Sequence, residues 1–180
     1  MSDYRRLNVP GGSYFFTVVI EQRRPILCTP PMRAALKSAI RSVRGKHPFH
    51  IAGMVLLPDH LHMIWTLPEG DSDYPLRIRL IKTHMTKACG ALMPDHEPNQ
   101  RRQRKHCGVL WQHRYWEHAL RSEDDFRFHL DYVHWNPVKH GLVQRVRDWP
   151  WSSFHRYVAA DVYPIDWCAA ADVAGYALAR

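Results

Sequence analysis

The segment FHIAGMVLLPDHLHMIWTL, residues 49–67, decides the fold, because two apolar runs flank a Pro-Asp pair. Runs of this length with aromatic and β-branched residues are typical of strands, and a proline followed by aspartate is typical of a turn. We therefore expect strands over residues 49–57 and 60–67, joined at Pro58-Asp59. The segment predicts an antiparallel hairpin.

One further strand and two helices surround this hairpin in the sequence. Residues 13–20, SYFFTVVI, follow the turn at Gly11-Gly12 and are aromatic and β-branched, so they predict a strand. Apolar residues recur at helical spacing from Pro30-Pro31 to Gly45, and again over residues 74–89. Both segments therefore predict helices, each with basic residues on its outer side.

The second half of the chain predicts a loop, a short strand and a third helix. Residues 90–109 are polar and contain a run of basic residues, which is typical of a solvated loop, with phosphate contact as the alternative. A short strand is expected within residues 109–120. Ser122 can cap the next helix, with Asp125 three positions later, and Pro137 predicts that this helix ends at about Asn136. The patterning of residues 159–180 is weak.

The order strand, helix, strand, strand, helix, strand, helix favours an α+β domain with helices packed on an antiparallel sheet. A chain of 180 residues is long enough for one core and too short for two comfortable domains, so we expect a single domain over residues 1–180. Its four cysteines form no CxxC pair, which speaks against a zinc ribbon and a disulfide scaffold.

The charge balance favours an anionic partner. Lys and Arg number 25 against 17 Asp and Glu, a net charge of +8 that attracts polyanions such as nucleic acid or an anionic membrane surface, although simple solubility is the alternative. The chain contains no run of about 20 apolar residues that could span a bilayer. Residues 1–10 lack the hydrophobic centre of a signal peptide. We therefore expect a cytoplasmic protein.

A histidine pair in the predicted hairpin is the first candidate for chemistry. His60 and His62 are two residues apart in a strand, so both side chains point to one face while Leu61 and Met63 point to the other. Two imidazoles placed in this way can chelate one metal ion. The alternative is a pair of histidines that merely form hydrogen bonds at the end of a strand.

The third predicted helix carries a polar stripe beside its apolar one. Asp125, His129, Tyr132 and Asn136 follow the spacing i, i+4, i+7 and i+11, which places them along one side of the helix. A tyrosine hydroxyl is a weak nucleophile unless a cation or a base assists it, and a metal on the histidine pair could assist through the scissile phosphate. The stripe therefore indicates phosphoryl transfer, with an interfacial tyrosine that only forms hydrogen bonds as the alternative.

Several motifs together resemble a known family. LPDHLHMIW (residues 57–65) and HLDYVHWNPVKHG (residues 129–141) resemble the single-tyrosine transposases of the HUH superfamily, which are IS200-like. GGSYFFT (residues 11–17) and WPWSS (residues 149–153) are similar to the branch called REP-associated tyrosine transposases. The resemblance covers residues from about 4 to 158.

This resemblance implies a ferredoxin-like domain that nicks single-stranded DNA beside REP-type hairpins. His60 and His62 would hold Mg²⁺ or Mn²⁺, and Tyr132 would form the 5′-phosphotyrosine. A third ligand would come from the tyrosine helix, at Asn136 or at its rival His129. Zn²⁺ also suits a two-histidine site. The alternative function is a non-catalytic protein that binds hairpin DNA or RNA, and the active form could be a monomer or a homodimer.

Basic residues in three segments are candidates for contact with DNA phosphates. They lie in the leader, on the second predicted helix and in the loop: Arg5, Arg6, Arg77, Lys82, Lys87, Arg101, Arg102, Arg104 and Lys105.

Overall fold

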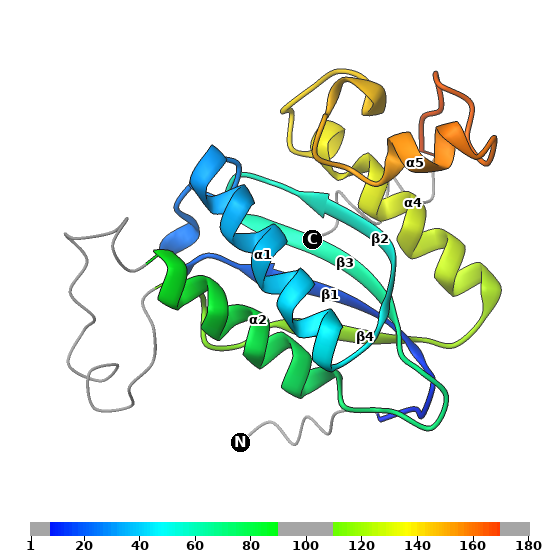
Figure 1. Ribbon diagram of the computed structural model, residues 1–180. Helices are drawn as coiled ribbons and strands as arrows, with labels where there is room; N and C mark the ends of the chain where they lie inside the picture. Colours follow the sequence, from blue (N-terminus) through cyan, green and yellow to red (C-terminus); the bar gives the residue numbers. More distant parts are fainter. Residues whose placement is uncertain (1–7, 90–109, 170–180) are drawn as a thin grey trace, which may run out of the picture.

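A four-stranded antiparallel sheet with strand order β2-β3-β1-β4 forms the centre of the computed structural model, which describes residues 8–89 and 110–169 (Figure 1). Elements β1, α1, β2, β3, α2 and β4 follow one another along the chain, which is the order of a ferredoxin-like domain. The predicted α+β class is therefore confirmed. The bounds are β1 Ser13–Val19, α1 Pro30–Lys46, β2 His50–Leu56, β3 His60–Thr66, α2 Tyr74–Cys89, β4 Trp116–Leu120, α4 Glu123–Lys139 and α5 Phe154–Ala159, with 3-10 turns η1 Glu21–Arg23 and η3 Val146–Asp148.

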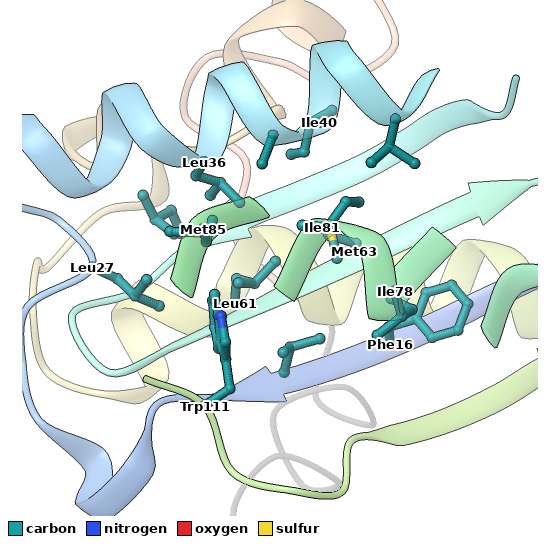
Figure 2. Close-up of a cluster of buried hydrophobic side chains, with 14 of the residues drawn as sticks. Phe16, Leu27, Leu36, Ile40, Leu61, Met63, Ile78, Ile81, Met85 and Trp111 are labelled. Atoms are coloured by element: carbon teal, nitrogen blue, oxygen red, sulfur yellow. The ribbon is translucent and has the colours of Figure 1, made fainter. Parts of the chain in front are cut away.

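The sheet separates two hydrophobic cores, because alternate side chains of a strand point to opposite faces. Helices α1 and α2 cover one face, where Phe16, Leu61 and Met63 of the strands are buried (Figure 2). Helix α4 lies on the other face, where Phe15 and Ile64 are buried. Residues 49–67 thus contribute side chains to both cores. Strand β3 pairs with β1 in a register that places Thr17 opposite His62.

Helix α4 begins as predicted and ends later than predicted. The Ser122 hydroxyl caps it by accepting a hydrogen bond from the Asp125 N–H at 3.1 Å. The prediction of an end near Asn136 is wrong, because Pro137 lies inside the helix, which continues to Lys139. A proline this close to the helix end removes only the one N–H that would reach back to Val133, and the Asn136 carbonyl still accepts from the His140 N–H at 3.0 Å.

The segment after α4 covers the outer edge of β2, which would otherwise present unpaired backbone groups. The Leu56 N–H donates to the Trp151 carbonyl at 2.9 Å, and the Ser153 N–H donates to the Met54 carbonyl at 2.8 Å. The described part of the tail also packs, because the Tyr163 hydroxyl donates to the Asp131 carboxylate on α4. None of the helices within residues 8–89 and 110–169 combines the length and the hydropathy that crossing a membrane requires.

Candidate active site

The two histidines of β3 lie on the α4 face of the sheet. His60 and His62 are each 4% exposed, and their ring centroids are 4.9 Å apart. Leu61 and Met63 belong to the core on the opposite face, so the predicted alternation along this strand is confirmed.

Each of these imidazoles is oriented by a partner on its Nδ1 atom. Nδ1 of His60 lies 2.6 Å from Oδ1 of Asp59, and Nδ1 of His62 lies 2.9 Å from Oγ1 of Thr17. Burial would raise the pKa of Asp59, but the hydrogen bonds and charges of His60 and Arg23 lower it to about 2, so its carboxylate stays ionised. Partners of this kind orient metal-binding histidines and leave Nε2 as the ligand atom.

Helix α4 brings an amide and a phenol to the same place. The Asn136 side chain is fully buried, and its Nδ2 donates to the Tyr132 carbonyl at 2.8 Å. The Tyr132 ring centroid lies 5.4 Å from that of His62. Within residues 8–89 and 110–169, neither Nε2 of His62 nor Oδ1 of Asn136 forms a hydrogen bond of ordinary geometry, although the two side chains are close enough to interact.

Such unpaired buried atoms are costly unless a ligand satisfies them. Both atoms are of the kind that binds a divalent metal, one imidazole nitrogen and one amide oxygen. The donor set of His60, His62 and Asn136 therefore fits a metal ion, and the unpaired atoms are the evidence for that fit.

The pKa of His62 is well below its ordinary value, chiefly because the ring is buried. The charges of His60, His140 and Lys139 lower it further, whereas the Asn136 side chain acts in the opposite direction. His62 is thus held as the neutral imidazole, which is the form that binds metals.

His129, the rival third ligand, takes part in a different cluster. Its Nδ1 lies 2.9 Å from Oδ1 of Asp125, and Nε2 of His118 on β4 lies 3.0 Å from Oδ2 of the same carboxylate. The Phe15 ring contacts both His129 and His62, with centroid distances of 5.0 and 5.3 Å. The ligand atoms of His118, Asp125 and His129 all lie within 4.8 Å of one another, so these side chains could hold a metal ion. Within the described residues, no other group of three or more His, Cys, Asp or Glu side chains is this close together.

Two residues of the site were missed by sequence reasoning. Lys139 donates from Nζ to the Tyr132 hydroxyl at 3.2 Å, and the His140 ring lies 5.1 Å from the His60 ring. Lys139 is seven residues after Tyr132, which is two helical turns, so helical spacing would have found it if the helix had been expected to pass Pro137.

One of the predicted DNA contacts, Arg77, is buried. The prediction that Arg77 is exposed on α2 is wrong, because its side chain is 3% exposed and its guanidinium binds the Asp71 carboxylate at 2.5 Å. It also donates to the carbonyls of His47, Pro48 and Asp73, so it joins the start of α2 to the end of α1. A charge on a helix is solvated only where the helix face is open, and this face meets the α1–β2 connection.

The two lysines of α2 lie in a groove. Lys82 is half-buried and its Nζ donates to the Gln112 carbonyl at 2.7 Å, whereas Lys87 is exposed. Both line a groove of about 910 Å³ between α2 and residues 111–115, together with Trp111 and Tyr115. The remaining predicted contacts lie outside the described residues: Arg5, Arg6, Arg101, Arg102, Arg104 and Lys105.

Known proteins share this sequence and fold. The family "Transposase IS200 like" matches residues 8–135. The REP-associated tyrosine transposase of Escherichia coli K12 is 47% identical over 93% of this chain and 91% of its own, and a putative REP-associated tyrosine transposase of Haemophilus influenzae is 41% identical over 93% of each. A solved REP-associated tyrosine transposase bound to a REP hairpin superposes with a TM-score of 0.81 at 46% identity, covering 94% of this chain and 93% of that one. The chain therefore belongs to the IS200-like transposases, in their branch of REP-associated tyrosine transposases, and is one of these enzymes.

Proposed function

We propose that this transposase nicks single-stranded DNA beside REP-type hairpins and rejoins it to another strand through a 5′-phosphotyrosine on Tyr132. The observation that carries the proposal is that Tyr132 lies beside two buried ligand atoms, Nε2 of His62 and Oδ1 of Asn136, which form no hydrogen bond with any residue that the structure describes. A nucleophile beside a set of metal ligands is what metal-assisted phosphoryl transfer requires.

The substrate follows from the relatives and from the surface. The solved relative is described as bound to a REP hairpin, and the groove beside α2 combines basic Lys82 and Lys87 with aromatic Trp111 and Tyr115. Lysines give affinity for phosphates, and aromatic side chains stack on bases. We assign this groove to DNA, with Lys87 as the exposed phosphate contact and Lys82 as a residue that shapes the groove.

The metal site consists of His60, His62 and Asn136. Bound there, Mg²⁺ or Mn²⁺ would polarise a non-bridging oxygen of the scissile phosphate. Asn136 is preferred to His129 as third ligand because the Asn136 side chain interacts with His62, whereas His129 lies with Asp125 and His118. Asp59 and Thr17 hold the two rings in place through Nδ1.

The reacting group is the Tyr132 hydroxyl. Its oxygen forms a bond to phosphorus while the bond from phosphorus to the 3′-oxygen breaks, so the 5′-phosphate stays on the tyrosine. The phosphodiester bond energy is thereby kept for rejoining. Because His60, His62, Tyr132 and Asn136 come from one described domain, a single chain can supply the whole site, and the proposal needs no second copy.

The test is a covalent-adduct assay. The protein is incubated with Mg²⁺ or Mn²⁺ and single-stranded hairpin oligonucleotides from the repeats beside its gene, and adducts are separated on a denaturing gel. We expect a metal-dependent adduct that Tyr132→Phe abolishes and that Tyr115→Phe, a control on the other face of the sheet, retains. Tight hairpin binding without a nick under either metal would contradict the proposal and favour a non-catalytic hairpin-binding protein.

A further inference from the structure

Lys139 contacts the hydroxyl of Tyr132. Its Nζ donates to the Tyr132 hydroxyl at 3.2 Å and lies 5.2 Å from the centroid of the tyrosine ring. The two residues are seven positions apart, so they occupy the same side of α4, with Asn136 between them. The lysine therefore reaches the one atom that the proposed reaction uses as its nucleophile.

Lys139 lies where a positive charge interacts favourably with the end of α4. Lys139 is half-buried in the last turn of α4, where the partial negative charge of the helix end stabilises a cation. It is also close enough to His62 to lower the pKa of that imidazole. Lys139 thus adds a positive charge that contacts the tyrosine oxygen and acts on His62.

We propose that Lys139 is a catalytic residue that stabilises negative charge on the Tyr132 oxygen, when this oxygen attacks and again when it departs. The inference rests on the proposed function, because it assigns Lys139 to the same reaction.

In the cleavage step the electron pair of the tyrosine oxygen forms the O–P bond, and the pair of the P–O3′ bond stays on the 3′-oxygen. The phenolic proton passes to solvent water, and solvent water protonates the 3′-oxygen. In rejoining, the 3′-hydroxyl attacks and the tyrosine oxygen leaves. The ammonium donates to the tyrosine oxygen without accepting its proton, so the same hydrogen bond serves both directions.

Substitutions at position 139 can separate the charge of the lysine from its packing. A hydrogen bond from a preorganised donor to an oxygen that gains charge is commonly worth about 100- to 1,000-fold in rate. Arginine is also a permanent cation with several N–H donors, so it can replace the charge of Lys139, although its planar head alters the geometry. Methionine keeps the approximate length of lysine and removes the charge. The three side chains together separate charge from packing.

The experiment compares Lys139→Met and Lys139→Arg with the control Lys37→Met, which removes the same charge from an exposed lysine of α1 that lies outside the site and the groove. Single-turnover rates are measured for adduct formation and for rejoining of the purified adduct with a 3′-hydroxyl strand. Affinities for the hairpin oligonucleotide and for Mn²⁺ are measured on the same proteins. We expect Lys139→Met to slow both steps by about 100-fold or more, with Lys139→Arg recovering part of the loss and both affinities within threefold of the original.

Two results would overturn the assignment. One is a Lys139→Met protein that cleaves at the original rate, and the other is a loss of hairpin or Mn²⁺ affinity as large as the loss of rate. Tyr132→Phe separates this inference from the proposed function. An adduct that survives Tyr132→Phe defeats the proposed function itself, whereas an adduct that needs Tyr132 but not Lys139 defeats only the role of the lysine.

Discussion

Two polar clusters lie on the α4 face of the sheet, and the Phe15 ring contacts a histidine of each. The first, His60, His62 and Asn136, contains buried atoms that have no partner among the residues that the structure describes. The second, His118, Asp125 and His129, is held together by its own hydrogen bonds. Similar residue types can thus serve two purposes, because the first cluster lies beside the Tyr132 ring whereas the second joins β4 to the start of α4.

The second cluster fastens the tyrosine helix to the sheet. The Asp125 carboxylate also accepts from the Arg121 N–H at 3.0 Å, so it joins the end of β4, the turn and the first turns of α4. Burial would raise its pKa, yet these hydrogen bonds and the nearby histidine charges lower it. We interpret the cluster as a structural fastening, even though its donor atoms are close enough together for an ion.

The largest difference should appear when one histidine of each cluster is removed. We expect His62→Ala to lower the single-turnover cleavage rate by about 1,000-fold or more, because the metal's stabilisation of transition-state charge is worth several kcal/mol. His118→Ala should change the rate less than about tenfold, since it weakens only the fastening of α4. Equal losses in the two variants would remove the distinction between the clusters.

Substitution of the carboxylate in each cluster should affect metal affinity differently. Asp59→Asn weakens the group that orients His60, so Mn²⁺ affinity measured by calorimetry should fall by about 10- to 100-fold. Asp125→Asn is the matched control, because it makes the same change in the second cluster. Loss of Mn²⁺ affinity in the control instead would transfer the metal to His118 and His129.

The second cluster should matter more for stability than for the reaction. Asp125→Ala removes the acceptor for Arg121, His118 and His129, which should cost about 1–3 kcal/mol of unfolding free energy. For a chain of this length the melting temperature should fall by a few degrees, roughly 2–4 °C per kcal/mol. Thermal unfolding measures this loss, and the variant should still form the adduct. An unchanged melting temperature would show that Asp125 fastens nothing.

Acid should affect the fastening by a smaller amount. Burial is the main reason that the pKa of His129 is lowered, so the folded protein binds a proton on this ring less readily than the unfolded chain does. Below the ordinary histidine pKa of about 6.5, the unfolded chain binds more protons than the folded chain. The free energy of unfolding therefore falls by at most about 1.4 kcal/mol per pH unit. Melting curves from pH 7.5 to 5 should show a shallower decline in His129→Gln than in the unaltered protein. Parallel declines would contradict this assignment.

The fold was largely predictable from the sequence, because its cues are local. The run at residues 49–67 encodes its own strands and turn, and α2 has the predicted bounds, Tyr74–Cys89. The end of α4 was not predictable from Pro137 alone, since a proline near the last turn costs only one backbone hydrogen bond. That error of one turn concealed Lys139, which lies just beyond it.

The arrangement of the candidate site residues was partly predictable, and the burial of its charged residues was less so. Strand alternation placed His60 and His62 together, and helical spacing placed Tyr132 beside Asn136. Spacing along a helix does not reveal what covers it, so Arg77 appeared exposed although the α1–β2 connection buries it. Nor could spacing along the helix show that His129 binds Asp125 on α4 while the same carboxylate binds His118 on β4.

The most direct test of the central claim is the position of the metal itself. Crystals soaked with Mn²⁺ can be measured at a wavelength where manganese scatters anomalously. We predict one strong anomalous peak bounded by the Nε2 atoms of His60 and His62 and by Oδ1 of Asn136, close to the Tyr132 hydroxyl. A peak among His118, Asp125 and His129, with none between the β3 histidines, would contradict the account.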